Sequence, residues 1–304
     1  MYPADSKVYT DYLVECWAAQ GFLGDVNDTC YQDVRDKGHV ILDDLVNVSL
    51  LEKGERKIYV RMHDCIGQLA LHISSKSPDC HTYVMTSENS MQPDNSKAMK
   101  NSRWVSMIDS KLIDLLNGLG SVMLSTLLLQ KNAELAVIQQ TFFENMTNLV
   151  LLDLYGTRIE ELSSSLSTLI ALKRLYLNDC MLLTLLPSEI GSLQCLQVLD
   201  IREIERLLMF KEVTERERYV LPKLEKLVLN NLPIFKSICT KETLAWPSLN
   251  LLEIYDCLAL KALPFGMDNA ANLRSIKGQK EWWDNLEWTN NKAQEQLQII
   301  FKAS

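Results

Sequence analysis

The side chains best suited to catalysis in this sequence are those of cysteine and histidine. The 304 residues include eight cysteines and four histidines, and two of the histidines lie close to a cysteine: His63 precedes Cys65 by two positions, and Cys80 adjoins His81. A cysteine nucleophile needs a base whose side chain meets its sulfur atom, whereas side chains this close along the chain usually cannot converge on one reacting atom. We therefore expect a protein that is not an enzyme, and an enzyme with a Cys/His site is the least favoured alternative.

Metal and nucleotide binding are also disfavoured by residue spacing. The cysteines form no C-x-x-C pair and stand at no zinc-ligand spacing with the histidines. The sequence lacks a G-x-x-x-x-G-K-[S/T] segment, whose backbone amides and lysine hold nucleotide phosphates. We therefore expect no metal ion and no cofactor in this chain.

Composition and charge exclude several other classes of function. Hydrophobic residues make up 47% of the chain and charged residues 23%, which is a globular composition. The net charge of −8 argues against a nucleic-acid platform and against an anionic membrane surface, because both need basic residues. The N-terminus shows no signal segment and no apolar run is long enough to span a bilayer, so we expect a cytoplasmic protein with reduced, buried cysteines.

One apolar pattern recurs through the C-terminal two-thirds of the chain. It reads L-x-x-L-x-L-x-x-(N/C/T)-x-L, and its copies begin at residues 102, 124, 149, 172, 196, 224, 249 and 273. The intervals between these starts are 22 to 28 residues, within the range of leucine-rich repeats. A single copy cannot bury its own apolar face, so the copies are expected to stack into a solenoid with one continuous core.

Each copy predicts a short strand with inward leucines, while the side chains between them point to the concave side. A small side chain at Asn132, Thr157, Cys180 and Cys257 is expected to turn inward and satisfy backbone groups where the strand ends. The residues expected on the concave face are Asp153, Tyr155, Tyr176, Asn178, Asp200, Arg202, Asn230, Glu253, Tyr255 and Lys277. Concave solenoid faces commonly bind proteins, so we interpret these residues as a protein-binding surface with its three tyrosines as exposed anchors. The alternative is that these residues are polar only because they face solvent.

Two further segments bear on this architecture. Mixed charge across residues 202–218 accompanies the longest interval and predicts a solvated helix or loop on the outside, with a docking site as the alternative. Near the C-terminus, Trp282, Trp283 and Trp288 are interpreted as part of a cap over the open end of the solenoid rather than as a ligand cage.

The first part of the chain does not repeat. Apolar residues have helical spacing around residues 12–18, 33–46 and 66–73, and a hairpin centred on Gly54 separates the second and third helices. Helices with a β-hairpin wing suggest a small winged-helix domain, but one without a basic recognition helix for DNA. We therefore predict an α/β protein with a winged-helix domain at residues 1–85. A horseshoe-shaped leucine-rich-repeat solenoid of about seven to eight repeats follows at residues 86–304.

Three N-terminal segments resemble one protein family. Residues 12–23 (YLVECWAAQGFL), 43–51 (DDLVNVSLL) and 60–73 (VRMHDCIGQLALHI) are similar to the winged-helix domain of plant nucleotide-binding (NB-ARC) leucine-rich-repeat disease-resistance proteins of the coiled-coil class. Met62, His63 and Asp64 match the MHD switch motif of that family. The repeats and the ending NLRSIKGQKEWWDNLEW resemble the family as well.

The resemblance implies an intracellular plant immune receptor in which this region recognises proteins and contributes to autoinhibition. It implies that His63 contacts the phosphate of ADP, but only together with a nucleotide-binding core that carries the missing phosphate loop; ADP and ATP are cofactors of the intact family. The implied partners are a pathogen effector, a guarded host protein or the receptor's own nucleotide-binding domain, in the cytoplasm or at the periphery of the plasma membrane. We interpret the chain as a truncated product, a partial gene model or a fragment of such a receptor. A repeat adaptor or scaffold without an immune role is the main alternative.

Overall fold

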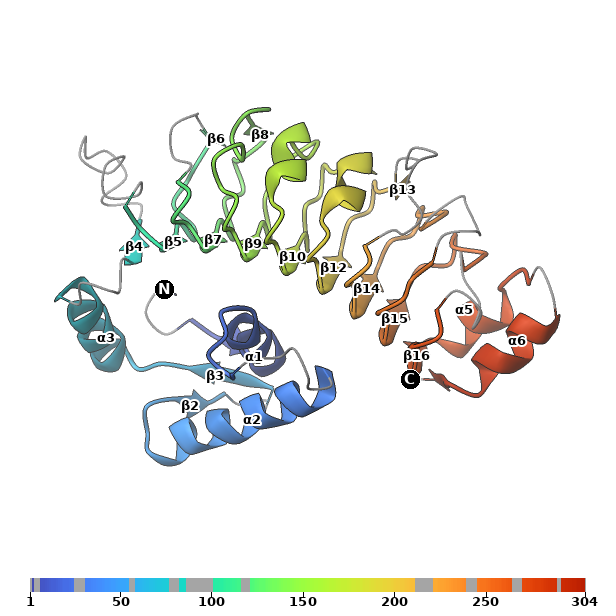
Figure 1. The fold of residues 1–304 in the computed structure, drawn as a ribbon, viewed down its shortest axis with the longest axis horizontal. Coiled ribbons are helices and arrows are strands. Elements are labelled where there is room, and N and C mark those ends of the chain that lie inside the picture. Colours follow the sequence, from blue (N-terminus) through green and yellow to red (C-terminus); the bar gives the residue numbers. More distant parts are fainter. Residues whose placement is uncertain are drawn as a thin grey trace.

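The protein folds into a curved repeat array with a small helical domain inside the curve (Figure 1). The computed structural model describes residues 2, 6–24, 31–54, 58–76, 82–85, 101–115, 121–210, 221–238, 245–263, 270–288 and 291–303. Among the described residues, no helix is long and apolar enough to cross a bilayer.

The N-terminal domain contains the three helices and the hairpin that the sequence predicts. Its elements are β1 (Val8–Tyr9), α1 (Thr10–Ala19), α2 (Tyr31–Asn47), β2 (Glu52–Lys53), β3 (Tyr59–Arg61) and α3 (Asp64–Lys76). β3 pairs antiparallel with both β1 and β2. The core between α1 and α2 includes Val14, Leu42 and Val60. The helices approach closely at Gly38, where a Cβ atom would lie 2.4 Å from Cγ1 of Val14.

The concave side of the array is one parallel sheet of ten strands among the described residues. In order along the sheet these are β4 (Thr82–Val84), β5 (Trp104–Ser106), β7 (Thr126–Leu128), β9 (Leu151–Asp153), β10 (Arg174–Tyr176), β12 (Val198–Arg202), β14 (Lys226–Asn230), β15 (Leu251–Tyr255), β16 (Ser275–Gly278) and β17 (Phe301–Ala303). Leu175 pairs with Leu152 and with Leu199, which confirms the predicted repeat register. The leucine-rich-repeat fold predicted from the sequence is therefore correct, and the sheet begins at Thr82, slightly before the predicted domain boundary.

Short elements complete the outer side of the array. They are β6 (Asp114–Leu115), β8 (Val137–Ile138), β11 (Leu185–Leu186), β13 (Met209–Phe210) and the 3-10 helices η1 (Ser164–Thr168) and η2 (Ser188–Ser192). In the charged segment 202–218, the structure places Arg202 in β12 and the pair Met209–Phe210 in β13. Residues 211–218 of this segment lie outside the described residues.

The inward polar positions behave as expected. The Oδ1 atom of Asn132 accepts hydrogen bonds from the backbone amides of Ser110 and Leu112, at 3.0 and 3.1 Å. Its Nδ2 atom donates to the carbonyl oxygens of Met107 and Leu129. This fully buried amide thus joins two neighbouring repeats, because it satisfies backbone groups that the turns would otherwise leave unpaired.

The C-terminal tryptophans cover the end of the solenoid. Trp282 and Trp283 lie in α5 (Lys280–Asp284) and are buried, and the ring of Trp283 stacks on Phe301 at 4.2 Å. Helix α6 (Asn291–Gln298) adds the buried Leu297 to the same core. These residues keep the last repeat from meeting water, as the end of an open solenoid requires.

Candidate functional site

Helix α1 has two buried faces. Val14 and Ala18, four residues apart, pack into the core of the N-terminal domain. Tyr12 and Cys16 point the other way and join a separate apolar cluster with residues of the repeat sheet. The helix therefore lies between the two domains and covers part of the concave face, as Figure 1 shows. We call this contact between α1 and the concave strands the docking interface.

The centre of the docking interface is a buried ion pair. The Glu15 carboxylate lies 2.7 Å from the Lys226 ammonium, and its second oxygen accepts a hydrogen bond from the Tyr176 hydroxyl at 2.8 Å. The side chains of Lys226 and Glu15 are only 9% and 5% exposed. Removal of either partner would leave the other charge buried and unpaired. The interface therefore requires opposite charges at positions 15 and 226.

A second polar group surrounds Asp153. The Tyr12 hydroxyl donates to the Asp153 carboxylate at 2.7 Å, and the side-chain amide of Gln130 donates to the same oxygen. The Tyr2 hydroxyl in turn donates to the Tyr12 hydroxyl at 2.9 Å. Burial raises the pKa of Asp153 to about 6, although these donors act in the opposite direction.

A third polar group is centred on Gln20, immediately after α1. Its amide nitrogen donates to the Thr126 hydroxyl at 2.6 Å. Its carbonyl oxygen accepts from the Trp104 indole at 3.1 Å and from the Ser125 hydroxyl at 2.8 Å. One side chain of the N-terminal domain thus bridges strands β5 and β7.

Apolar contacts fill the space between these polar groups. Leu128 and Leu151 occupy outward positions of their strands, yet each is 1% exposed because Tyr12 and Cys16 cover them. The Tyr12 ring meets the Tyr176 ring edge-on at 4.8 Å. Apolar residues at outward strand positions indicate in the sequence that another part of the protein covers this face. The pattern of the inward leucines alone does not contain this information.

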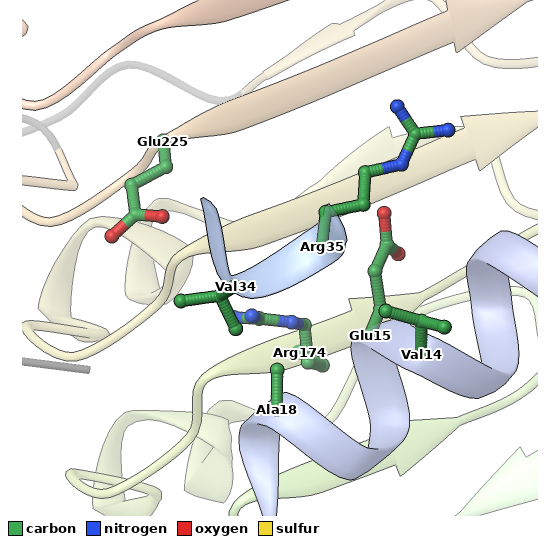
Figure 2. Close-up of a pocket in the computed structure, with 7 residues that line it drawn as sticks. All are labelled: Val14, Glu15, Ala18, Val34, Arg35, Arg174 and Glu225. Carbon is green, nitrogen blue, oxygen red and sulfur yellow. The ribbon is translucent and has the colours of Figure 1, made fainter. Parts of the chain in front are cut away.

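A small pocket opens at the side of the docking interface. Its lining residues are Val14, Glu15, Ala18, Val34, Arg35, Arg174 and Glu225, which Figure 2 shows. Arg174 is buried and donates to Gln197, while its Nε atom has no hydrogen-bond partner among the described residues. The pocket has room for about one water molecule, which is too little for a substrate.

The structure divides the ten residues predicted on the concave face. All ten lie on or beside the concave strands, but Asp153, Tyr176 and Asp200 are 1%, 2% and 4% exposed. The expectation that they are exposed is wrong, because local repeat periodicity carries no information about a helix more than a hundred residues away. The other seven are at least partly exposed, and we call them the uncovered residues: Tyr155, Asn178, Arg202, Asn230, Glu253, Tyr255 and Lys277.

The uncovered residues form a balanced polar strip. Arg202 pairs with Asp200 through two hydrogen bonds of 2.6 and 2.7 Å, and Lys277 pairs with Glu253 at 2.9 Å. Tyr155 is 37% exposed and Tyr255 is half-buried.

The Met62–His63–Asp64 triplet lies at the start of α3. His63 is exposed, and its Nδ1 atom accepts a hydrogen bond from the Cys65 amide at 3.3 Å. Among the described residues, no ion pair involves His63. His63 therefore presents its imidazole at the surface of the N-terminal domain.

The described cysteines differ in burial. Those that the structure describes, Cys16, Cys65, Cys180, Cys195 and Cys257, are free, whereas Cys30, Cys80 and Cys239 lie outside the described residues. Burial raises the pKa of Cys180 and of Cys257 to about 12, so both thiols stay protonated at neutral pH. Cys65 is exposed, which corrects the expectation that all the cysteines are buried. Within the described part of the chain, no cluster of His, Cys, Asp or Glu side chains could hold a metal ion.

Docking of the N-terminal domain is expected to tighten on mild acidification. The docked pKa of Asp153 is about 6, against an ordinary value of 3.8. A raised carboxyl pKa favours the docked state below the ordinary pKa, and this contribution is lost as the pH rises through about 6. Burial raises the pKa of Asp200 in the same direction. The shift of Asp153 alone should lower the docking equilibrium constant about tenfold between pH 5 and pH 7.

Hydrogen exchange of strands β9 and β10 across this pH range, corrected for intrinsic exchange rates, measures the change. The Asp153→Asn variant should abolish most of it. Docking that tightens as the pH rises would contradict the assignment of the Asp153 carboxyl.

Comparison with known proteins links this architecture to one family. Residues 1–70 match the family model described as "Disease resistance protein Winged helix domain", and residues 123–182 match "Leucine rich repeat". Disease resistance protein At4g27190 of Arabidopsis thaliana is 33% identical over 66% of this chain, and Probable disease resistance protein At4g27220 is 32% identical over 62%. A Leptospira interrogans LRR protein, LIC12759, covers 69% of this chain and 79% of its own, at 17% identity with a TM-score of 0.32, too distant to inform function.

The chain spans about one fifth of the length of these two curated relatives, 20% in each case. The first matched region contains α1 and α2, and the second contains β7, β9 and β10, three of the strands that face α1. The chain therefore belongs with the plant disease-resistance proteins, of which it carries the winged-helix domain and leucine-rich repeats.

Proposed function

We propose that this chain is the protein-recognition and autoinhibition module of an intracellular plant immune receptor. The observation that carries the proposal is the docking interface, in which the buried Glu15–Lys226 pair holds the winged-helix domain against the concave face. A module that is closed by its own neighbouring domain has two states, docked and released. Any partner that prefers one of them shifts the equilibrium.

The uncovered strip is the proposed contact surface in the docked state. Tyr155 and Tyr255 supply partly exposed rings with polar tips, and the flanking ion pairs supply hydrogen-bonding groups. Tyrosine is favourable at interfaces because it offers a large contact area at low entropic cost. The proposed partners are a pathogen effector, a guarded host protein or the receptor's own nucleotide-binding domain, met in the cytoplasm or at the periphery of the plasma membrane.

The module is proposed to act by binding and not by catalysis. Its use of ADP through His63 is proposed to require a nucleotide-binding core with a phosphate loop, which this chain does not contain. The chain alone should therefore bind ADP no better than its His63→Ala variant. Micromolar ADP affinity in calorimetry that disappears with His63→Ala would contradict this part of the proposal.

The recognition surface is tested with the double variant Tyr155→Ala/Tyr255→Ala in the full chain. We expect an unchanged thermal melt, because both rings are partly exposed, and a loss of about 1–3 kcal/mol of partner binding per ring. Co-precipitation with the nucleotide-binding region and with candidate host and effector proteins measures the loss. Met181→Ala is the matched control, since Met181 is 56% exposed and not on a concave strand. If the double variant still bound every partner, the recognition surface would have to lie outside this strip.

The immune role is distinguished from that of an adaptor by a second readout. A receptor that carries this region with Glu15→Lys is expected to trigger a defence response without a pathogen, because the docking interface is broken. The Asp44→Lys receptor should stay silent, since Asp44 is exposed and forms no ion pair among the described residues. A repeat adaptor without an immune role would give no response with either variant.

A further inference from the structure

Helix α1 marks a helix-binding site on the repeats. We propose that the part of the concave face under α1 binds an amphipathic helix of a protein partner, which takes the place of α1. This inference rests on the proposed function and names the kind of partner that releases the docked state. The site consists of the three polar groups around Lys226, Asp153 and Thr126, together with the apolar side chains of Leu128 and Leu151.

The site requires a helical ligand because of the spacing of its contacts. Tyr12, Glu15 and Cys16 of α1 and its C-cap residue Gln20 contact the repeats, at relative positions 0, 3, 4 and 8, which form one face of a helix. Tyr12 contacts β9 and Gln20 contacts β7, and these strands are neighbours in the sheet. Eight residues rise about 12 Å in a helix and about 27 Å in a strand, so an extended peptide would overshoot the second contact.

The side chains lining the site define the chemistry of the ligand. Lys226 and Arg174 are two cationic residues that are buried, so the central position of the ligand must be a carboxylate, as Glu15 is. One turn earlier, a hydroxyl must donate to Asp153, and just beyond the end of α1 a carboxamide must bridge Thr126 and Trp104. A small apolar residue follows the carboxylate, where Cys16 packs on the cluster that includes Leu128 and Leu151.

Replacement of α1 does not require the winged-helix domain to unfold. The face of α1 that carries Val14 and Ala18 stays packed against α2 and the antiparallel sheet, whose core is separate from the docking cluster. The domain can therefore leave the concave face as a unit with α1 still folded. A partner helix has to compete with a tethered one, whose effective concentration is on the order of millimolar, so it needs contacts beyond those of α1. The neighbouring uncovered strip provides them.

The test uses two fluorescent helical peptides and two variants of the full chain. Both peptides carry residues 8–24 with Val14 and Ala18 replaced by glutamine, so that only the docking face remains, and they differ at position 15, which is glutamate in one and lysine in the other. The chain variants are Glu15→Lys and Lys226→Glu, each of which breaks the internal ion pair. Binding is measured by fluorescence anisotropy, and hydrogen exchange of the chain reports separately whether α1 has been released.

The proposal predicts a reciprocal pattern. The Glu15→Lys chain should bind the glutamate peptide about 30-fold more tightly than the lysine peptide, and the Lys226→Glu chain should show the reverse preference. Failure of both peptides to bind a chain whose α1 is released would overturn the inference, while the proposed autoinhibition would stand. Equal binding of both peptides would also overturn it. If neither variant releases α1, the proposed function itself fails, because the docking interface then does not depend on its central ion pair.

Discussion

The Glu15→Lys variant is expected to release the winged-helix domain from the repeats while both domains stay folded. In the native protein the Glu15 carboxylate is 2.7 Å from the Lys226 ammonium and accepts a hydrogen bond from the Tyr176 hydroxyl. The substitution places two cations together in a site that excludes water, and breaking a buried pair of this kind costs about 3–5 kcal/mol. That cost falls on docking and not on the core of either domain, because Glu15 lies between them.

Hydrogen exchange measures the release. The concave strands β9, β10 and β12 should gain exchange in the Glu15→Lys chain, whereas β16 and β17, at the far end of the sheet, should keep their protection. Asp44→Lys is the matched control, since it makes the same change of charge at an exposed position of α2. Equal protection of the concave strands in Glu15→Lys and in the native chain would mean that the ion pair does not hold the interface.

The Leu175→Asp variant is expected to destabilise the repeat array severely. Leu175 is fully buried in β10 and pairs with Leu152 and Leu199 on either side. Loss of a buried leucine costs about 2–5 kcal/mol, and an unpaired carboxylate in the same place adds several more unless it takes up a proton. The total should exceed about 4 kcal/mol, which places this variant among the most damaging single substitutions.

Urea denaturation followed by circular dichroism checks this expectation. Leu258→Asp is the matched control, because Leu258 is 46% exposed and the chemical change is identical. That variant should stay within about 0.5 kcal/mol of the native chain. A Leu175→Asp chain as stable as the Leu258→Asp chain would show that the repeat register is wrong.

The inward half of each repeat could be predicted from the sequence, and the reason is local. Leu175 in β10 and Leu177 immediately after it alternate with the outward Tyr176, and a solenoid has one core to which such leucines can point. The same reasoning placed Asn132 at an inward turn, where its amide satisfies the backbone of two repeats. Inward positions therefore depend only on neighbouring repeats, and the pattern of one sequence is sufficient for them.

The outward half could not be predicted in the same way. Whether Asp153 or Tyr176 meets water depends on α1, which lies 141 residues from Asp153 and 161 from Tyr176 along the chain when counted from Tyr12 and Glu15. No local period encodes a contact over that distance. The useful signal was the apolar character of Leu128 and Leu151 at outward positions, because a solvated concave face has no reason to carry them.

We expect charge complementarity across the docking interface to decide whether the winged-helix domain is docked on the repeats or released from them. The winged-helix domain contributes the buried carboxylate of Glu15. The repeats contribute the Lys226 ammonium, which pairs with it, and the Tyr176 hydroxyl, which donates a hydrogen bond to it. The remaining contacts, around Asp153 and Gln20, are hydrogen bonds between neutral or weakly acidic groups. They orient α1 on the repeats and contribute less to the free energy of docking. A reversal of charge at both ends should therefore leave the interface intact.

The double variant Glu15→Lys/Lys226→Glu tests the central claim most directly. The two single variants should each expose β9, β10 and β12 to hydrogen exchange, because each brings like charges together at the centre of the interface. The double variant restores an opposite pair in the same place, and it should recover most of the native protection of these strands. Concave strands that exchange as fast in the double variant as in the single variants, with both domain cores still protected, would contradict the docking of α1 through this ion pair.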